Sequence, residues 1–199
     1  MEYTISIQHI EHVNHNVLRI VADKPKGYSF RPGQATELCI KKEGWKDEKR
    51  PFTFTCLPED DRLEFTIKVY PSHDGVTEQL DELKVGDELI ITDAWGAIEY
   101  KGEGTFIAGG AGITPFIAIL KDLLDKDQLE GNTLIFSNKK EKDIIYKNNL
   151  EAWLGDNVHF ILSEESNNGY DSGHIDAEYL KKHNLNTARP VYLCGPPEM

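Results

Sequence analysis

Residues 105–116 read Thr-Phe-Ile-Ala-Gly-Gly-Ala-Gly-Ile-Thr-Pro-Phe, an apolar run that ends in a glycine-rich turn and continues with helical spacing. The run predicts a buried strand over Thr105–Ala108, and Pro115 suits the first turn of a following helix. A strand, a glycine turn and a helix start in this order present backbone N–H groups to a phosphate group. Gly110 and Gly112 would let the main chain approach a pyrophosphate, although the spacing alone suits a purely structural turn equally well.

The chain after this turn alternates between strand and helix patterns. Short apolar runs predict the strands, and segments of helical spacing predict the helices between them. Strands and helices that alternate at this spacing are typical of βα units, which predicts a parallel sheet. The predicted strands cover residues 105–108, 133–137, 158–163 and 191–194, and the predicted helices cover about 115–127, 143–154 and 176–183.

The chain before the turn carries short alternating patterns and frequent turn residues instead. Six strands without a long helix predict a small antiparallel barrel. The pattern changes over Lys101–Gly104, so we predict two domains, residues 1–101 and residues 102–199. The predicted strands cover residues 3–7, 17–21, 35–40, 52–57, 63–70 and 88–92, with one short helix over about 77–83.

The composition predicts a soluble globular protein and excludes some partners. The chain has 199 residues, with 22 Lys and Arg against 34 Asp and Glu, and a formal charge of −12. This field repels polyanions, so a nucleic-acid partner is not expected. No apolar run approaches the roughly 18 residues of a membrane helix, and the N-terminus has no signal-peptide pattern. These features predict a cytoplasmic protein without a membrane partner.

The cysteines and histidines give no pattern for a metal centre. A zinc or iron–sulfur ligand set is not formed by the three widely spaced cysteines, Cys39, Cys56 and Cys194. Their number and spacing fit reduced thiols, and a cysteine at a strand end is most often inert packing. The histidines at positions 9, 12 and 15 recur within a strand-and-turn pattern, so we interpret them as surface residues.

Four motifs in one order carry a family resemblance that covers nearly the whole chain. Arg50-Pro51-Phe52-Thr53 opens a predicted strand, Gly75-Val76-Thr77 begins a short helix, and Cys194-Gly195-Pro196-Pro197-Glu198-Met199 follows the last strand. Together with the glycine turn, this set resembles the ferredoxin–NADP reductase family, and most closely its compact flavodoxin and ferredoxin reductases. The resemblance implies a six-stranded Greek-key barrel that binds FAD, followed by an α/β domain that binds NAD(P).

The resemblance also implies an activity. Members of this family pass a hydride from NADPH or NADH to FAD and then pass electrons to a flavodoxin- or ferredoxin-type protein. The chain is therefore expected to be a FAD-dependent NAD(P)H oxidoreductase. Two alternatives stay open: the reductase component of a multi-component oxygenase, and a non-catalytic flavin-binding interaction subunit.

The residues expected to bind FAD follow from the resemblance and agree with their chemistry. The arginine offers a charged fork for phosphate, the phenylalanine a flat apolar face, and the threonine of the same motif a hydroxyl near flavin N5. The main chain over 67–69 is assigned to the ring and ribitol, and 75–77 to the pyrophosphate, with Thr77 predicted as a helix N-cap. The full set is Arg50, Pro51, Phe52, Thr53, Ile67, Lys68, Val69, Gly75, Val76 and Thr77.

The nicotinamide nucleotide is assigned by the same resemblance to the glycine turn and to the ends of the later strands. Hydride transfer needs two rings held within reach and no acid–base group. The residues implied beside its path are Thr53, Thr114 and Cys194. The residues expected to bind the nucleotide are Gly110, Ala111, Gly112, Ile113, Thr114, Pro115, Ser137, Asn138, Lys139, Cys194, Gly195 and Pro196.

Two features of the second half depart from the family pattern. Lys139 stands where an arginine often holds the 2′-phosphate of NADPH, whereas Glu164 and Glu165 place carboxylates in the next loop. Because carboxylates repel phosphate, NADPH is preferred only slightly and NADH stays open. The family normally continues beyond Pro-Pro-Glu-Met with a helix and a strand, so the second domain is expected to lack these elements.

Overall fold

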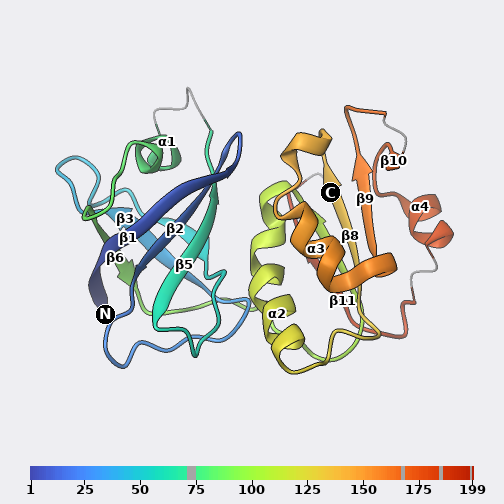
Figure 1. The fold of residues 1–199 in the computed structure, drawn as a ribbon, viewed down its shortest axis with the longest axis horizontal. Helices are drawn as coiled ribbons and strands as arrows, with labels where there is room; N and C mark the ends of the chain where they lie inside the picture. Colours follow the sequence, from blue (N-terminus) through green and yellow to red (C-terminus); the bar gives the residue numbers. More distant parts are fainter. Residues whose placement is uncertain (71–74, 167–168, 184–185, 198) are drawn as a thin grey trace.

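The computed structural model describes residues 1–70, 75–166, 169–183, 186–197 and 199; residue 198 of the last motif and residues 71–74 lie outside these ranges. Two sheets lie side by side, an antiparallel barrel and a parallel sheet flanked by helices (Figure 1). The predicted fold class is therefore confirmed. Within the described ranges, no helix is both long enough and apolar enough to cross a membrane.

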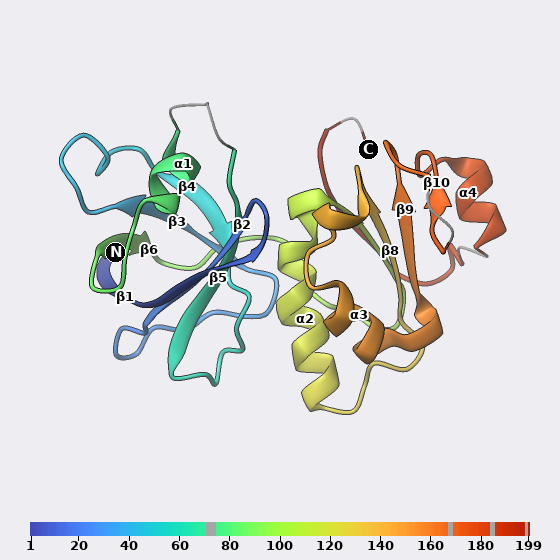
Figure 2. The same cartoon turned by 45° about the horizontal axis from the view of Figure 1, so that its top comes forward.

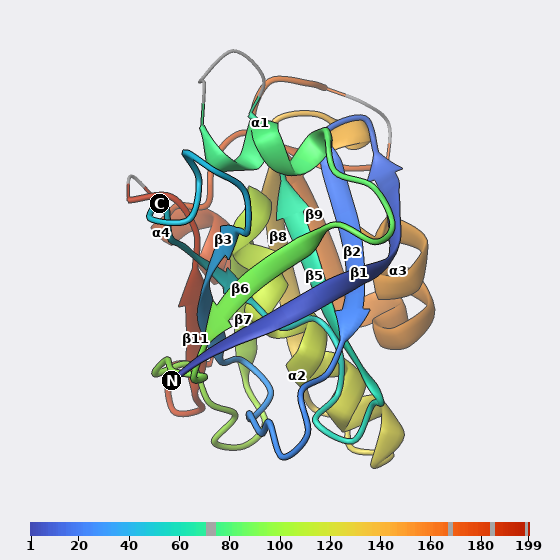
Figure 3. The same ribbon diagram turned by 90° about the vertical axis from the view of Figure 1, so that its left-hand side faces the viewer.

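The first sheet is antiparallel and has the strand order β4-β3-β6-β1-β2-β5. Neighbours in this order are not always neighbours in sequence, which gives the Greek-key connection that was predicted. In Figure 3, β1 crosses the front of this sheet between β6 and β2. The elements are β1 (Glu2–Asn14), β2 (Val17–Asp23), β3 (Ala35–Ile40), β4 (Arg50–Thr53), β5 (Arg62–Lys68), α1 (Val76–Asp81) and β6 (Glu88–Thr92).

Period-two alternation along the strands builds the core of the barrel. On β5, Leu63, Phe65 and Ile67 point into the barrel and are at most 1% exposed. Phe54 lies at the centre of this core, with its ring 5.2 Å from that of Phe65 and 4.3 Å from that of Phe30. Phe54 and Phe65 also form a backbone bridge, so the two end strands of the sheet meet and close the barrel at this point.

The second sheet is parallel, with the order β10-β9-β8-β7-β11. Helices α2 and α3 pack on one face, and α4 packs on the other (Figure 1). Both faces of the central strands are buried, as a parallel sheet requires. The strands are β7 (Thr105–Gly109), β8 (Thr133–Asn138), β9 (Val158–Leu162), β10 (Asp171–Ser172) and β11 (Val191–Cys194); the helices are η1 (Gly110–Ile113), α2 (Thr114–Asp125), η2 (Glu141–Asp143), α3 (Lys147–Leu154), η3 (Gly155–Asn157) and α4 (Ala177–Lys182).

Helix α2 lies along the boundary between the two domains (Figure 1). Residues 115–120 are all buried, and a helix that is apolar on most sides is one that packs on most sides. One side covers the parallel sheet through Phe116 and Leu120. On another side the barrel approaches so closely that a Cβ on Gly33 would lie 3.2 Å from Cδ1 of Ile119. The barrel residue Val17 is buried in the core of the second domain, so the two domains share one packed boundary.

The start of one helix and the presence of one short strand are the main differences from the sequence prediction in the second domain, where other boundaries differ by one or two residues. Helix α3 begins at Lys147 rather than at Asp143, because Tyr146 takes a positive φ of 53° and interrupts the helix before it. Asp143 instead caps the short helix η2, where its carboxylate accepts from the N–H of Lys140 at 3.0 Å. The two-residue strand β10 was not predicted, since a polar pair carries no periodicity that could indicate a strand.

Candidate functional site

The ends of β7 and β11 bring two of the sequence motifs together. These strands are parallel neighbours, with Ala108 in register with Cys194, so the turns that follow them meet at the carboxyl edge of the sheet. This edge is where ligands bind in open α/β sheets. The contact is closest at Gly112, where a Cβ would lie 2.2 Å from the carbonyl oxygen of Cys194 and 2.8 Å from the nitrogen of Gly195. Only glycine fits at position 112.

A second glycine of the turn, Gly110, serves a different purpose. Gly110 has a φ of +51°, and a Cβ built on it would meet no atom within 4 Å. Its conformation, rather than the space around it, therefore favours glycine, and it opens the one-turn helix η1 that leads into α2. Thr114 begins α2 and donates its hydroxyl hydrogen to the carbonyl oxygen of Ala111 at 3.0 Å. Thr114 is half-buried, and its hydroxyl oxygen can still accept a hydrogen bond.

The end of β8 supplies the third part of this edge. Ser137 is in register with Gly109, which places residues 137–139 beside the glycine turn. Asn138 is 5% exposed, and no described residue hydrogen-bonds to its side-chain nitrogen or oxygen. An amide of this kind offers a donor and an acceptor to a polar ligand. Together with the close main-chain packing at Gly112, this donor set fits a dinucleotide at the carboxyl edge.

The barrel has two unpaired strand edges next to the bridge that closes it. Beyond the bridge between Phe54 and Phe65, antiparallel geometry sets Arg50–Thr53 of β4 opposite residues 66–69, which are the end of β5 and the residue after it. Strand β4 pairs with β3 and strand β5 with β2, and no ladder joins β4 to β5 in the described chain. These two facing segments, named the open edges below, include two of the three segments that were predicted to bind FAD.

The open edges carry the chemistry that a flavin dinucleotide needs. Arg50 is exposed, and its guanidinium bonds to the Glu48 carboxylate at 3.1 Å and to the Lys49 carbonyl at 2.8 Å. Phe52 is half-buried and packs on the barrel core, and Thr53 follows it on the same strand. A guanidinium, an aromatic face and a hydroxyl lie within four consecutive residues beside unpaired backbone groups. This donor set fits FAD.

The third predicted FAD segment begins helix α1, but not as predicted. The N-cap is Gly75, with no side-chain cap, and the helix starts at Val76, so Thr77 lies inside the first turn and is not the N-cap. The reason is packing: Val76 and Leu80 are one helical turn apart and both are buried in the barrel core. A helix that started at Thr77 would lose this pair. The expected role of residues 75–77 toward the pyrophosphate stays a prediction.

Both parts of the candidate site lie at one end of the molecule. Figures 1 and 2 place α1, the last residues of β5 and the start of α2 at the same end. The β1–β2 hairpin reaches across the domain boundary there, with Nε2 of His15 at 3.2 Å from Oδ1 of Asp143. The histidines at 9, 12 and 15 are exposed and each pairs with a carboxylate, as surface residues do.

The thiols in the structure are neutral at physiological pH. Burial raises the pKa of the Cys194 thiol, which is half-buried beside the glycine turn. Burial also raises the pKa of Cys39, and it raises that of Cys56 to about 12. A neutral thiol is a poor nucleophile. Cys194 can therefore pack against a ring or donate a weak hydrogen bond, but it is not poised for covalent chemistry.

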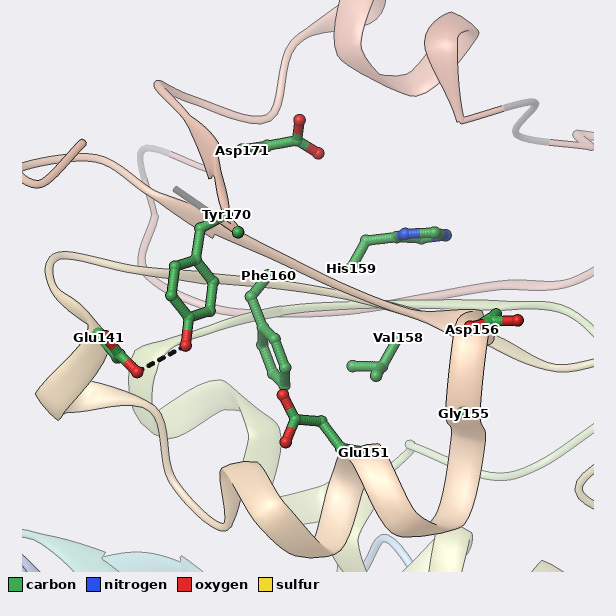
Figure 4. Close-up of a pocket in the computed structure, with 10 residues that line it drawn as sticks. Glu141, Glu151, Gly155, Asp156, Val158, His159, Phe160, Tyr170 and Asp171 are labelled. Carbon is green, nitrogen blue, oxygen red and sulfur yellow. Dashed lines mark hydrogen bonds between the residues drawn. The ribbon is translucent and has the colours of Figure 1, made fainter. Parts of the chain in front are cut away.

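Two cavities lie elsewhere in the second domain. The one in Figure 4, of about 640 Å³, lies beside β9 and carries the carboxylates of Glu141, Glu151 and Asp156; the Tyr170 hydroxyl donates to Glu141 at 2.7 Å. Its acidic lining would repel a phosphate. The other, of about 830 Å³, lies after β8 and β9, where lysines and carboxylates alternate. The lining of this second cavity includes Lys140, which follows the predicted residue Lys139, and Glu164, which pairs with Lys139.

A polar group at the domain boundary was not found from the sequence. Glu64 on β5 is 7% exposed, and it receives Lys121 of α2 at 2.9 Å and Arg19 of β2 at 2.7 Å. The sequence shows Glu64 only as the polar member of an alternating strand. Its partner Lys121 is 57 residues away, on a helix of the other domain. No local pattern could have indicated this pair.

Comparisons with known proteins match both halves of the chain. The model of the family described as "FAD-binding domain" matches residues 2–92, and the model described as "Oxidoreductase NAD-binding domain" matches residues 106–199. NADH-cytochrome b5 reductase 1 of Aspergillus terreus is 31% identical over 209 residues, which cover 94% of this chain and 70% of that protein. The reductase component of propane 2-monooxygenase from Mycolicibacterium smegmatis is 29% identical over 197 residues, covering 92% and 56%.

The fold also matches solved structures. A ferredoxin NADP+ reductase from Neisseria gonorrhoeae, crystallised with FAD and NADP, superposes with a TM-score of 0.83 over 99% of this chain and 86% of that chain, at 19% identity. At this identity the match shows the fold alone. The chain spans between 52% and 62% of the length of the first three curated relatives that it matches.

Proposed function

The chain belongs to the ferredoxin–NADP reductase family of FAD- and NAD-binding oxidoreductases, and from this premise we propose that it is a FAD-dependent NAD(P)H oxidoreductase. The observation that carries the proposal is the meeting of two turns, at Gly112 and Cys194, beside the start of α2. This start lies at the same end of the molecule as the last residues of β5, one of the open edges (Figures 1 and 2).

The residues that would hold FAD lie on the open edges and at the start of α1. When bound, FAD accepts a hydride from a nicotinamide donor and returns the electrons to an acceptor. Arg50 would bind a phosphate oxygen through its exposed guanidinium, and Phe52 would give the ring system an apolar surface. The hydroxyl of Thr53 and the backbone of residues 67–69 would orient the ring. These assignments are proposals based on residue type and position.

The residues that would hold the donor lie at the carboxyl edge of the parallel sheet. The main chain at Gly110 and Gly112 would approach the pyrophosphate, and Asn138 would bond to a polar group of the nucleotide. Thr114 and Cys194, both half-buried, would lie beside the nicotinamide. As a neutral thiol, Cys194 would exclude water from the ring without reacting with it.

We further propose that NADH is the preferred donor, against the slight preference for NADPH that the sequence suggested. Nζ of Lys139 lies 2.8 Å from Oε1 of Glu164, so the lysine expected to hold a 2′-phosphate is paired already. Glu165 accepts from the N–H of Glu141 at 2.9 Å, which fixes a second carboxylate in the same loop. A ribose 2′-hydroxyl can donate to such carboxylates, whereas a 2′-phosphate is repelled.

The electron acceptor is proposed to be a small redox protein of the flavodoxin or ferredoxin type. A second candidate function is the reductase component of an oxygenase, which is favoured by the 29% identity to the propane 2-monooxygenase reductase component. The two functions share the flavin reaction and differ in the partner. Stopped-flow reduction of a purified flavodoxin, a [2Fe–2S] ferredoxin and an oxygenase component would separate them, because the physiological class should be reduced fastest.

One experiment tests the proposed function itself. The purified protein is loaded with FAD, its visible spectrum is recorded, and NADH or NADPH is added without oxygen. We expect the visible absorbance of the flavin to bleach. Bleaching should be about tenfold faster with NADH than with NADPH, the rate difference that ~1.4 kcal/mol of repulsion would give. A stable flavin spectrum that neither donor bleaches would instead support a non-catalytic flavin-binding subunit.

A further inference from the structure

The side chain of Lys121 on helix α2 makes polar contacts with the barrel. Lys121 follows Thr114 by seven residues, which is about two turns or ~10 Å along the helix. Its Nζ lies 2.6 Å from the carbonyl oxygen of Thr55 and 2.9 Å from Oε1 of Glu64. Thr55 is the residue directly after Phe54, where the barrel closes and the open edges begin. The helix therefore links both halves of the candidate site.

The acceptor of this lysine is itself held on several sides. Oε2 of Glu64 receives Nε and Nη2 of Arg19, each at 2.7 Å, and its Oε1 also receives the hydroxyl of Thr55 at 3.0 Å. Glu64 is 7% exposed, whereas the side chains of Lys121 and Arg19 are 29% and 32% exposed, so the two ion pairs are partly buried. Buried ion pairs of this kind add little net stability but require a defined geometry. The pair with Lys121 is thus a constraint on where α2 lies.

A second contact crosses the boundary beside the first. The hydroxyl of Tyr146 lies 3.2 Å from that of Thr66, which in turn lies 3.1 Å from that of Thr55. Tyr146 holds a φ of +53°, an uncommon conformation for a bulky residue that persists only where the surroundings fix it. Glu64 and Thr66 occupy the outer face of β5, which the second domain buries. Helix α2 and the residue that precedes α3 are therefore both attached to one strand of the barrel.

We propose that Lys121 is a positioning residue for hydride transfer. Through Glu64 and Thr55 it fixes α2, and with it the turn that begins at Gly110, at the separation from the open edges that the reaction needs. The inference rests on the proposed function. Lys121 contacts neither set of cofactor residues, so its effect would come from geometry, and a misplacement of about 1 Å can cost about 100-fold in rate.

The test compares three variants of α2 by stopped-flow reduction of the bound FAD without oxygen. Lys121→Met removes the interdomain charge, Lys121→Arg keeps it, and Lys126→Met removes an exposed lysine that pairs with Asp122 at 2.7 Å on the same helix. The measured quantities are the limiting reduction rate, the dissociation constant of NADH, the FAD content, and the isotope effect with NADH deuterated at C4.

We expect Lys121→Met to lower the limiting rate at least about tenfold, because of the geometric sensitivity of hydride transfer. The dissociation constant of NADH and the FAD content should stay within about threefold of those of the unmodified protein, a range that corresponds to ~0.6 kcal/mol. Lys121→Arg should recover part of the rate, and Lys126→Met should match the unmodified protein. A Lys121→Met protein with the unmodified limiting rate and isotope effect would overturn the proposal. The proposal would also be overturned if the reduction rate of Lys121→Met fell only in proportion to a loss of bound FAD.

Two further measurements keep the proposal testable. If Lys121→Met does not fold, the double variant Lys121→Met/Glu64→Gln also removes the buried carboxylate, which Lys121→Met leaves with Arg19 as its charged partner. Slow reduction by this protein supports the proposal and an unmodified rate refutes it. If neither donor bleaches the unmodified protein, the proposed function fails by itself. Limited proteolysis within residues 93–104, between β6 and β7, then tests by itself whether the contacts of Lys121 with Glu64 and Thr55 hold the two domains together. Faster cleavage in Lys121→Met than in Lys126→Met supports this role of Lys121, and equal cleavage refutes it.

Discussion

The α-carbon of Gly112 packs against the main chain of Cys194, leaving no space for a side chain: a Cβ would lie 2.2 Å from the cysteine carbonyl oxygen. In the Gly112→Ala protein, the two turns must therefore move apart. We expect its free energy of unfolding to fall by about 1–3 kcal/mol, as overpacking does, and its reduction by NADH to be lost. Urea unfolding and stopped-flow reduction measure the two effects.

The matched control for this substitution is Gly110→Ala. Position 110 has a positive φ of 51° but open space around it, so alanine adds backbone strain of about 1 kcal/mol without a clash. The control should keep measurable reduction by NADH. Equal activity in both variants would show that the contact with Cys194 has no part in the nucleotide site.

Removal of the Arg50 guanidinium should weaken FAD binding. Arg50→Ala deletes the exposed cation of the open edges, and a charge-assisted hydrogen bond to phosphate is worth about 1.5–3 kcal/mol, or roughly 10- to 100-fold in affinity. Arg31→Ala is the control, since Arg31 is an exposed barrel arginine that also pairs with a carboxylate, Glu99, at 2.9 Å. Flavin content after dialysis checks this. An Arg50→Ala protein that keeps its full yellow colour contradicts the assignment.

The donor preference should respond to the charge of Glu164. Glu164→Gln frees Lys139 from its ion pair and removes a carboxylate from the loop after β9. We expect the ratio of kcat/KM for NADPH to that for NADH to rise about three- to tenfold, which corresponds to roughly 0.6–1.4 kcal/mol. The control is Glu151→Gln, an exposed acid in the other cavity (Figure 4). If the ratio of kcat/KM values changes equally in Glu164→Gln and Glu151→Gln, the change comes from the net charge of the protein, and the assignment of Glu164 is wrong.

The buried ion pair at the domain boundary should make stability depend on acid pH. Burial by itself would raise the pKa of Glu64, but Lys121 and Arg19 outweigh it and hold the pKa below its ordinary value of 4.5. The group therefore stabilises the fold fully above about pH 4.5, and this contribution is lost as the pH falls through the lowered pKa. Urea midpoints should show that Glu64→Gln is less stable at pH 7 and that the difference narrows below pH 4.5.

The control for this pH dependence is Glu2→Gln. A hydrogen bond from Lys49 also lowers the pKa of Glu2, but this carboxylate is fully exposed to solvent. Exposed pairs contribute little, so the urea midpoints of this variant should follow those of the unmodified protein. A difference for Glu64→Gln that does not change between pH 7 and pH 3.5 would contradict the lowered pKa.

The folded protein should contain no fast-reacting cysteine. Burial raises the pKa of all three thiols, so the thiolate that attacks an alkylating reagent is scarce at pH 7.5. We expect iodoacetamide to label the native chain much more slowly than the same chain in urea, as measured by mass spectrometry. The half-buried Cys194 should be the first to react as the pH is raised. Rapid labelling of Cys194 at pH 7.5 would show an activated thiol.

The sequence predicted the fold class and most strands because their signals are local. The runs at 35–40, 88–92 and 191–194 have the predicted boundaries, since each is a short apolar or alternating segment between turn residues. Helix starts were predicted less well. The start of α1 depends on the burial of Val76, and the start of α3 depends on the left-handed conformation of Tyr146, and neither is encoded by neighbouring residues.

Parts of the candidate site were likewise predictable from local sequence, and other parts were not. The motifs could be found because each is contiguous, but the reason that two of them lie together is the register of β7 with β11, which pairs Ala108 with Cys194. The outer face of β5 was the least accessible to prediction. Glu64 and Thr66 alternate with apolar residues as solvent-facing residues do, and only the second domain buries them. Pairings across more than fifty residues leave no trace in local patterns.

The place of β11 in the sheet has a consequence for the order in which the protein can form on the ribosome. All six barrel strands lie within residues 2–92, so the barrel can close while the second half of the chain is still being synthesised. The turn at Gly112 is made long before its partner at Cys194. Its final shape must wait until residues 191–194 emerge and add to the edge of β7. Nascent chains would therefore gain a flavin-binding fold first and a nicotinamide-binding one last.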